Sequence, residues 1–211
     1  MTPVEQAALK SSPFQALYSP TEKIPTIVVD NFPALGKLAA LRFIEWAQNN
    51  SGGVISLPTG KTPEHFIKWV KHFLKNFATP AARAELERNG IDPAKRPNMQ
   101  SLSFVQIDEF YPINPQQHNS FYFYVNEYYI EGFGLDPKKA LLIDCSKLGM
   151  GKNETLQTVW PDNEVDLSLR FRPGHTNLER VQKRVLESVD QWCSEYEDRI
   201  RTLGGIGFFL G

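Results

Sequence analysis

Two stretches of the sequence combine an apolar run with chemically active residues at its end. They are Val54 to Thr62, VISLPTGKT, and Leu102 to Phe110, LSFVQIDEF. Each begins with the length and apolar character of a buried strand, and then breaks into polar or turn residues. Open α/β sheets bind ligands at the carboxyl ends of their strands, so the two stretches together predict one site.

The first stretch predicts an anion-binding loop. Pro58 and Gly60 break the strand, and Pro63 suits the first position of a helix. The unpaired N–H groups and the positive dipole end of that helix would face the mouth of the sheet, and Lys61 adds a full charge. A nucleotide-binding P-loop is excluded, because it needs a glycine five positions before Gly60, where this chain has Ile55. An ordinary capped turn that binds nothing is the alternative interpretation.

The second stretch predicts a general base. Asp108 and Glu109 directly follow the apolar strand residues 104–107. A carboxylate at the end of a buried strand is partly desolvated, which raises its pKa and makes it a usable base. Strand geometry points the two side chains to opposite sides, so one can face the cleft while the other pairs with a cation or caps a loop. Two solvated loop acids are the alternative.

Three motifs, in this order, resemble the glucosamine-6-phosphate deaminase (isomerase) family. They are LPTGKTP, IDEF followed by a loop and an Asn-Ser-Phe-Tyr helix start, and YEDRIRTLGGIGFFLG, and the resemblance covers roughly Ile24 to Gly211. It implies an α/β fold, a Rossmann-like parallel sheet with helices on both faces. It also implies conversion of glucosamine 6-phosphate to fructose 6-phosphate and ammonia, with no cofactor.

The resemblance also assigns roles to residues. Asp108 would move a proton between C2 and C1 of the sugar, and Glu109 is the second catalytic candidate, better suited to holding the loop. The substrate phosphate would be held by Thr59, Gly60, Lys61 and Thr62.

The sequence departs from the family in two places. Lys61 stands where the family often has glycine or serine, and the sequence stops at Gly211, before the family's Asp-Gly-His segment, ring-opening Glu and basic phosphate-binding residues. We therefore expect the N-terminal part of a longer enzyme, truncated at the C-terminus and inactive alone. Residues 1–23 would be an extension and 24–211 the incomplete domain, with insertions near 79–100 and 144–176.

Composition is that of a soluble globular protein, and the family resemblance implies a small-molecule sugar-phosphate partner. The 211 residues are 41% hydrophobic and 22% charged, and a net charge of −1 gives no field for nucleic acid. No signal peptide or membrane-length apolar run is present, so we expect a cytoplasmic protein with no membrane partner. Cys145 and Cys193 are too few for a disulfide framework or a metal site, and we expect reduced thiols and no metal. The family resemblance implies a homo-oligomer.

The remaining pattern alternates helices and strands, which favours a parallel sheet. A basic stripe that includes Lys68, Lys71 and Lys75 is expected to be a solvated helix face, and the loop 110–119 is placed to be a lid. We predict strands at 24–29, 54–57, 102–107, 140–143 and 206–210, and helices at 34–49, 63–77, 80–88, 120–131 and 177–203.

Two other functions remain open. 6-Phosphogluconolactonases share the superfamily frame, but they tend to carry a Ser-Gly-Gly-Ser loop and an Asp-Glu-Arg motif, where this chain has 59-TGKT-62 and 108-DEF-110. A non-catalytic sugar-phosphate sensor or assembly module is the alternative from another class.

Overall fold

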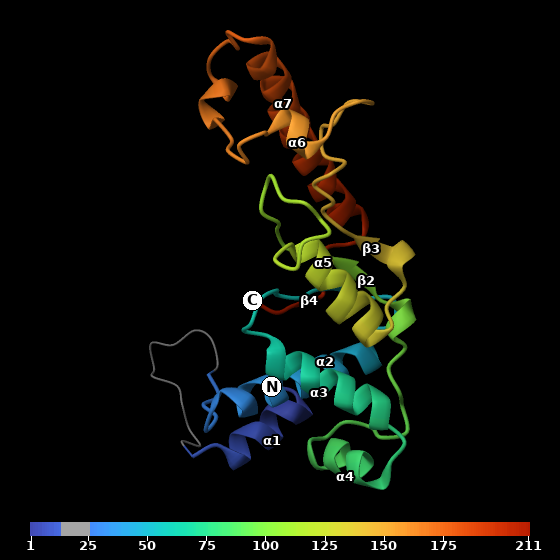
Figure 1. Ribbon diagram of the computed structural model, residues 1–211. Helices are drawn as coiled ribbons and strands as arrows, with labels where there is room; N and C mark the ends of the chain where they lie inside the picture. Colours follow the sequence, from blue (N-terminus) through green and yellow to red (C-terminus); the bar gives the residue numbers. More distant parts are fainter. Residues whose placement is uncertain (14–25) are drawn as a thin grey trace.

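A four-stranded parallel sheet lies at the centre of the computed structural model, which describes residues 1–13 and 26–211 (Figure 1). Its strand order is β3-β2-β1-β4. This order matches the first four strands of the doubly wound order 3-2-1-4-5-6, so the predicted α/β, Rossmann-like class is confirmed. The strands are β1 (Val54–Ser56), β2 (Ser103–Val105), β3 (Ala140–Leu141) and β4 (Phe208–Phe209).

The expected first strand at 24–29 is not part of the sheet. Residues 24 and 25 lie outside the described residues, and 26–29 form no strand. Instead this segment runs beside the N-terminal helix, where the Ser12 hydroxyl donates a hydrogen bond to the Val28 carbonyl at 2.7 Å. An apolar run becomes a strand only where a partner strand takes its backbone hydrogen bonds, and here a side chain takes one of them.

Three helices build the main core on one face of the sheet: α2 (Phe32–Asn49), α3 (Glu64–Asn76) and α5 (Phe121–Val125). The last continues as a π-helix, η2 (Asn126–Glu131). Apolar positions at helical spacing turn inward along α2 and α3, as their patterns predict. The core is rich in aromatic rings, among them Phe43, Phe66, Phe73, Phe104, Tyr129 and Phe133.

The N-terminal segment is partly helical rather than a featureless extension. Helix α1 (Pro3–Ser11) packs on α2, with Val4 fully buried and the Val4 N–H donating to Glu45 Oε1 at 3.2 Å. The region 79–100 contains the predicted short helix, α4 (Pro80–Arg88), followed by the turn η1 (Met99–Ser101). Leu86 of α4 is buried in the main core, so this region is part of the fold.

Residues 144–176 and the N-terminal half of α7 (Asn177–Thr202) form a separate lobe that projects away from the sheet (Figure 1). We call this unit the outer lobe. A short turn, η3 (Pro137–Lys139), precedes β3 and lies outside this lobe. The outer lobe contains α6 (Leu156–Val159) and the turn η4 (Leu167–Arg170). Its small core is made by Val159, Trp160, Leu169, Val185 and Leu186.

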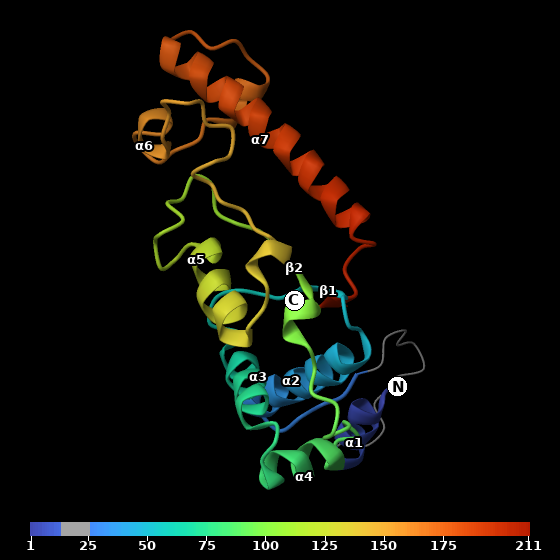
Figure 2. The ribbon, with the colours of Figure 1, turned by 90° about the vertical axis from the view of Figure 1, so that its right-hand side faces the viewer.

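The C-terminal half of α7 returns the chain to the sheet. Figure 2 shows this end of α7 and helix α5 on opposite sides of β2, so helices lie on both faces, as predicted. The Tyr196 hydroxyl lies 2.9 Å from the Gln106 carbonyl and 2.8 Å from the Leu141 carbonyl. One side chain of α7 therefore joins the ends of β2 and β3.

Candidate functional site

The two predicted stretches end at the same edge of the sheet. Strands β1 and β2 are parallel neighbours, with Val54 opposite Ser103 and Ile55 opposite Phe104. The Ser56 hydroxyl donates to the Val105 carbonyl at 2.7 Å, which fixes the last residues of the two strands together. The loop after β1 and the acids after β2 therefore emerge side by side from the carboxyl edge.

The loop after β1 turns at Gly60 and is anchored from beneath. Gly60 has φ +89°, a left-handed conformation that disfavours other residues, and its α-carbon faces open space. The Tyr129 hydroxyl, on a fully buried side chain, donates a hydrogen bond to the Pro58 carbonyl. Burial raises the pKa of Tyr129, so its hydroxyl keeps the proton that it donates. Thr59 is half-buried, whereas Gly60, Lys61 and Thr62 are exposed at the mouth.

Helix α3 begins at this loop without a side-chain cap. Pro63 occupies its N-cap, and Thr62, which could have capped it, makes no such bond. The N–H groups of His65 and Phe66 have no hydrogen-bond partner among the described residues. Every other α-helix in this part of the chain is capped by a side chain, from Thr2, Asn31, Thr79, Ser120, Thr155 and Thr176.

Gly36 of α2 allows the close approach that positions this helix end. A Cβ at Gly36 would lie 2.5 Å from the His65 Cβ and 2.8 Å from the Phe66 nitrogen. Contacts this short do not occur, so only glycine lets α2 lie against the first turn of α3. The sequence pattern did not identify this position.

Asp108 lies at the predicted edge but is more exposed than expected. Burial along β2 stops at Gln106, which is 1% exposed, and Ile107 is already 40% exposed. The expected desolvation of Asp108 by a buried strand was therefore wrong for the described residues. No described residue hydrogen-bonds to the Asp108 carboxylate, and the residue is exposed.

Glu109, in contrast, is fully engaged. Its Oε1 accepts hydrogen bonds from the N–H groups of Phe110 and Phe121, both at 3.0 Å. Its Oε2 accepts from the Ser120 hydroxyl at 2.8 Å and the Tyr122 N–H at 2.7 Å. The carboxylate closes the N-terminus of α5, where the helix dipole favours negative charge. This geometry supports the loop-holding role rather than that of a second base.

Gln106 supports the candidate site, and the sequence analysis did not predict this role. Its side-chain Nε2 donates to the Asp108 carbonyl at 2.9 Å, and its Oε1 accepts from the Ile143 N–H at 2.9 Å. The backbone on which Asp108 is carried is thus tied to the segment after β3. A buried amide inside an otherwise apolar run was the available signal.

The loop 110–119, expected to be a lid, is anchored at its beginning. Tyr111 packs on Trp160 of the outer lobe, and the Trp160 Nε1–H donates to the Tyr111 hydroxyl at 3.1 Å. Ile113 is buried with Cys145, and burial raises the pKa of the Cys145 thiol to about 12. The first residues of this loop therefore form a wall fixed to the outer lobe, whereas residues 116–119 are exposed.

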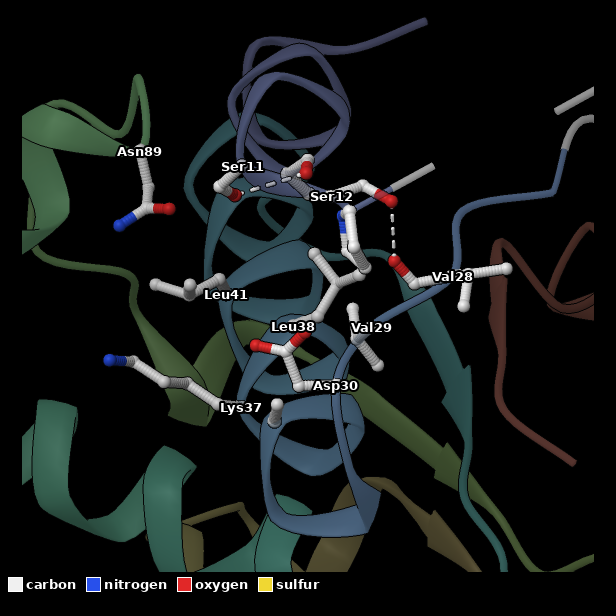
Figure 3. Close-up of a pocket in the computed structure, with 12 residues that line it drawn as sticks. Ser11, Ser12, Val28, Val29, Asp30, Lys37, Leu38, Leu41 and Asn89 are labelled. Carbon is white, nitrogen blue, oxygen red and sulfur yellow. Dashed lines mark hydrogen bonds between the residues drawn. The ribbon is translucent and has the colours of Figure 1, made fainter. Parts of the chain in front are cut away.

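A separate cavity of about 230 Å³ lies between α1 and α2, and none of the predicted site residues line it (Figure 3). Lys37, on its wall, is paired with Glu85. In the part of the chain that the structure describes, no three His, Cys, Asp or Glu side chains are grouped to hold a metal ion. Within the same residues, no helix has both the length and the apolar character needed to cross a membrane.

Comparison with known proteins supports the fold. No protein-family model and no curated protein matches the sequence. The structure is similar to that of a monomeric glucosamine-6-phosphate deaminase described as a missing link of the NagB superfamily. The TM-score is 0.52 and the sequence identity 15%, over 84% of this chain and 50% of the other, so the chain spans half the length of that enzyme. The fold implied by the family resemblance is therefore confirmed.

Proposed function

We propose that the protein converts glucosamine 6-phosphate to fructose 6-phosphate and ammonia. One observation carries this proposal: the uncapped N-terminus of α3 and the free carboxylate of Asp108 emerge from adjacent ends of one parallel sheet. The first suits a phosphate and the second a proton transfer at the same edge of the sheet. The shared fold with a glucosamine-6-phosphate deaminase supports this choice of substrate, although a fold alone does not fix a reaction.

The phosphate would bind at the loop Thr59 to Thr62. The first turn of α3, which has no side-chain cap, supplies the positive end of the helix dipole. Lys61 adds a full positive charge to this otherwise neutral loop. Two fixed features, the Tyr129 bond and the close contact with Gly36, hold the loop in place before the ligand arrives.

Asp108 would then act on the open-chain sugar. Its carboxylate removes the proton from C2, and the electron pair shifts toward C1 to give an enolamine. Return of the proton to C1 yields the imine of the ketose, and water hydrolyses that imine to release ammonia and fructose 6-phosphate. Glu109 and Gln106 are positioning residues in this scheme, because their hydrogen bonds hold the segments on either side of Asp108.

The direct test is ammonia release by the full-length protein supplied with glucosamine 6-phosphate. Turnover that depends on Asp108 would support the proposal. Hydrolysis of 6-phosphogluconolactone is the matched control, because the lactonase alternative uses the same phosphate loop with a different reaction. Lactone hydrolysis without ammonia release would overturn the assignment in favour of that alternative, and sugar-phosphate binding without either reaction would favour a sensor.

Assembly into a homo-oligomer remains part of the proposal. The enzyme of similar fold is described as a monomer. Light scattering of the purified full-length protein distinguishes the two states directly.

A further inference from the structure

A second hollow lies beside the phosphate loop, between α3 and the helix formed by α5 and η2. It has a volume of about 570 Å³, the size of a small-ligand pocket. We call it the α3–α5 groove. Its walls are formed by Gly60, Lys61, Glu64, Ile67, Lys68, Lys71, Tyr124 and Tyr128.

The charge of this groove is strongly positive compared with that of the whole chain. Three lysines and one glutamate line it, and Glu64 is neutralised by its ion pair with Lys68. The hydrogen bond from Lys68, and then its positive charge, lower the pKa of Glu64. Lys61 and Lys71 form no ion pair with any described residue, so two uncompensated ammonium groups border one hollow in a chain of net charge −1.

The opposite wall is aromatic. The rings of Tyr124 and Tyr128 lie 4.5 Å apart between centroids, and neither hydroxyl hydrogen-bonds to another described residue. Burial is the main cause that raises the pKa of Tyr124 to about 12, and the neighbouring Tyr128 and Glu64 add to it. The phenol therefore remains a neutral hydrogen-bond donor. Tyr128 belongs to the π-helix η2, and such irregular turns occur frequently at functional sites.

We propose that the α3–α5 groove binds a small phosphate ester. The groove shares Gly60 and Lys61 with the loop to which we assign the substrate phosphate, and it adds Lys71, Tyr124 and Tyr128, which that loop lacks. Its phosphate would bind the ammonium group of Lys71, and its organic part would pack on Tyr124 and Tyr128. A cation without an ion-pair partner favours an anionic group, and the tyrosine wall favours a ligand with an apolar or ring face. An open groove of this size suits a monomeric ligand such as a sugar phosphate or a nucleoside monophosphate.

The position of the lysines along α3 separates this site from an ordinary basic face. Lys68 and Lys71 line the groove, whereas Lys75, one turn further along the same helix, is exposed and does not. Lys71→Gln and Lys75→Gln therefore remove the same charge from the same helix. They differ only in whether that charge borders the hollow.

Calorimetric titration of the full-length protein with glucose 6-phosphate, AMP, inorganic phosphate and glucose tests the proposal. We expect at least one phosphate ester to bind, glucose not to bind, and Lys71→Gln to weaken the ester about tenfold. Lys75→Gln should change its affinity less than about twofold. The two esters distinguish a sugar phosphate from a nucleotide, and Tyr128→Ala should weaken either ester more than inorganic phosphate.

Equal effects of the two lysine variants, or no binding of any ester by the wild-type protein, would overturn the groove site. Melting temperatures of the variants exclude unfolding as the cause of a lost signal. The result is independent of catalysis, because Asp108→Asn should leave binding of the ester in the groove unchanged. Failure of the deaminase assay would therefore not overturn ester binding in the groove. Absence of ester binding would likewise not overturn the proposed deaminase activity.

Discussion

The ends of β1 and β2 lie next to each other, yet they use their polar groups in opposite ways. After β1, the loop is exposed, helix α3 has no side-chain cap, and one hydrogen bond from Tyr129 secures the backbone. After β2, Glu109 accepts four hydrogen bonds and the Gln106 amide bridges two segments. The helix after β1 has no side-chain cap, whereas the Glu109 carboxylate after β2 accepts hydrogen bonds at both of its oxygens.

This difference shows how a site can be both rigid and receptive. Free donors at the β1 end attract an anion only because a bound ligand can replace water there. At the β2 end, Glu109 is bound to the start of α5, and Asp108 is the acid without a described partner; Gln106 holds the backbone carbonyl of Asp108. A single reactive group is placed accurately when the residues around it are held by their own hydrogen bonds and packing.

Asp108→Asn should produce the largest effect, because it removes the only free acid at the β2 end while keeping its shape. We expect kcat for ammonia release to fall by about 10²- to 10⁴-fold, the usual contribution of a general base. Binding of glucosamine 6-phosphate, measured by calorimetry, should remain within about twofold, because the phosphate is held at the β1 end. Turnover close to that of the wild type would remove Asp108 from the mechanism.

Glu109→Gln should act on stability first. The amide nitrogen cannot accept hydrogen bonds, so at least one N–H or hydroxyl at the start of α5 loses its partner, together with the negative charge at the helix N-terminus. We expect about 2 kcal/mol lower free energy of unfolding, measured by urea denaturation. A drop in kcat larger than that of Asp108→Asn would instead make Glu109 the base.

Glu127→Gln provides the matched control for that variant. Glu127 is exposed on the following π-helix, and its carboxylate has no hydrogen-bond partner among the described residues. Its substitution should change stability by less than about 0.5 kcal/mol. Equal destabilisation by both variants would show that net charge, rather than the cap on α5, is responsible.

The elements that carry local patterns were predictable. Helical spacing and turn residues placed α2, α3, α4 and α7 within a few residues of their observed bounds, and the apolar runs placed the four sheet strands. The common edge of Thr62 and Asp108 followed from the parallel pairing of consecutive strands. In each case neighbouring residues were sufficient to specify the structure.

The residues that rigidify the site could not be predicted in this way. Tyr129 and the Pro58 carbonyl are 71 positions apart, and Tyr196 and the Gln106 carbonyl are 90 apart. A tyrosine on a helix carries no local sign of which distant carbonyl it will reach. The structure of the outer lobe could not be predicted from the sequence for a related reason. Its core forms only when Val185 and Leu186 of α7 pack against Trp160.

Gly36→Ala tests whether the β1 end depends on the approach of α2. The added methyl group would overlap the first turn of α3, and such overpacking costs about 1–3 kcal/mol, partly offset by the higher helix propensity of alanine. We expect lower thermal stability and weaker sugar-phosphate binding together. Gly132→Ala is the control, because its methyl group would lie 3.3 Å from the Glu127 carbonyl oxygen, a contact relieved by a shift of a few tenths of an ångström. Similar losses in both variants would contradict the role of Gly36.

Tyr129→Phe should have the smallest effect, and it isolates the one bond that secures the β1 loop. The ring stays in the core, but the buried hydroxyl no longer donates to the Pro58 carbonyl, which costs about 1 kcal/mol of folding stability. Because the loop then loses its anchor while Asp108 keeps its supports, sugar-phosphate affinity should fall about threefold with kcat nearly unchanged. Tyr128→Phe removes a hydroxyl with no described partner and should leave loop binding unaltered. If Tyr129→Phe lowers kcat but not affinity, phosphate binding at the β1 end and proton transfer at the β2 end are not separate functions.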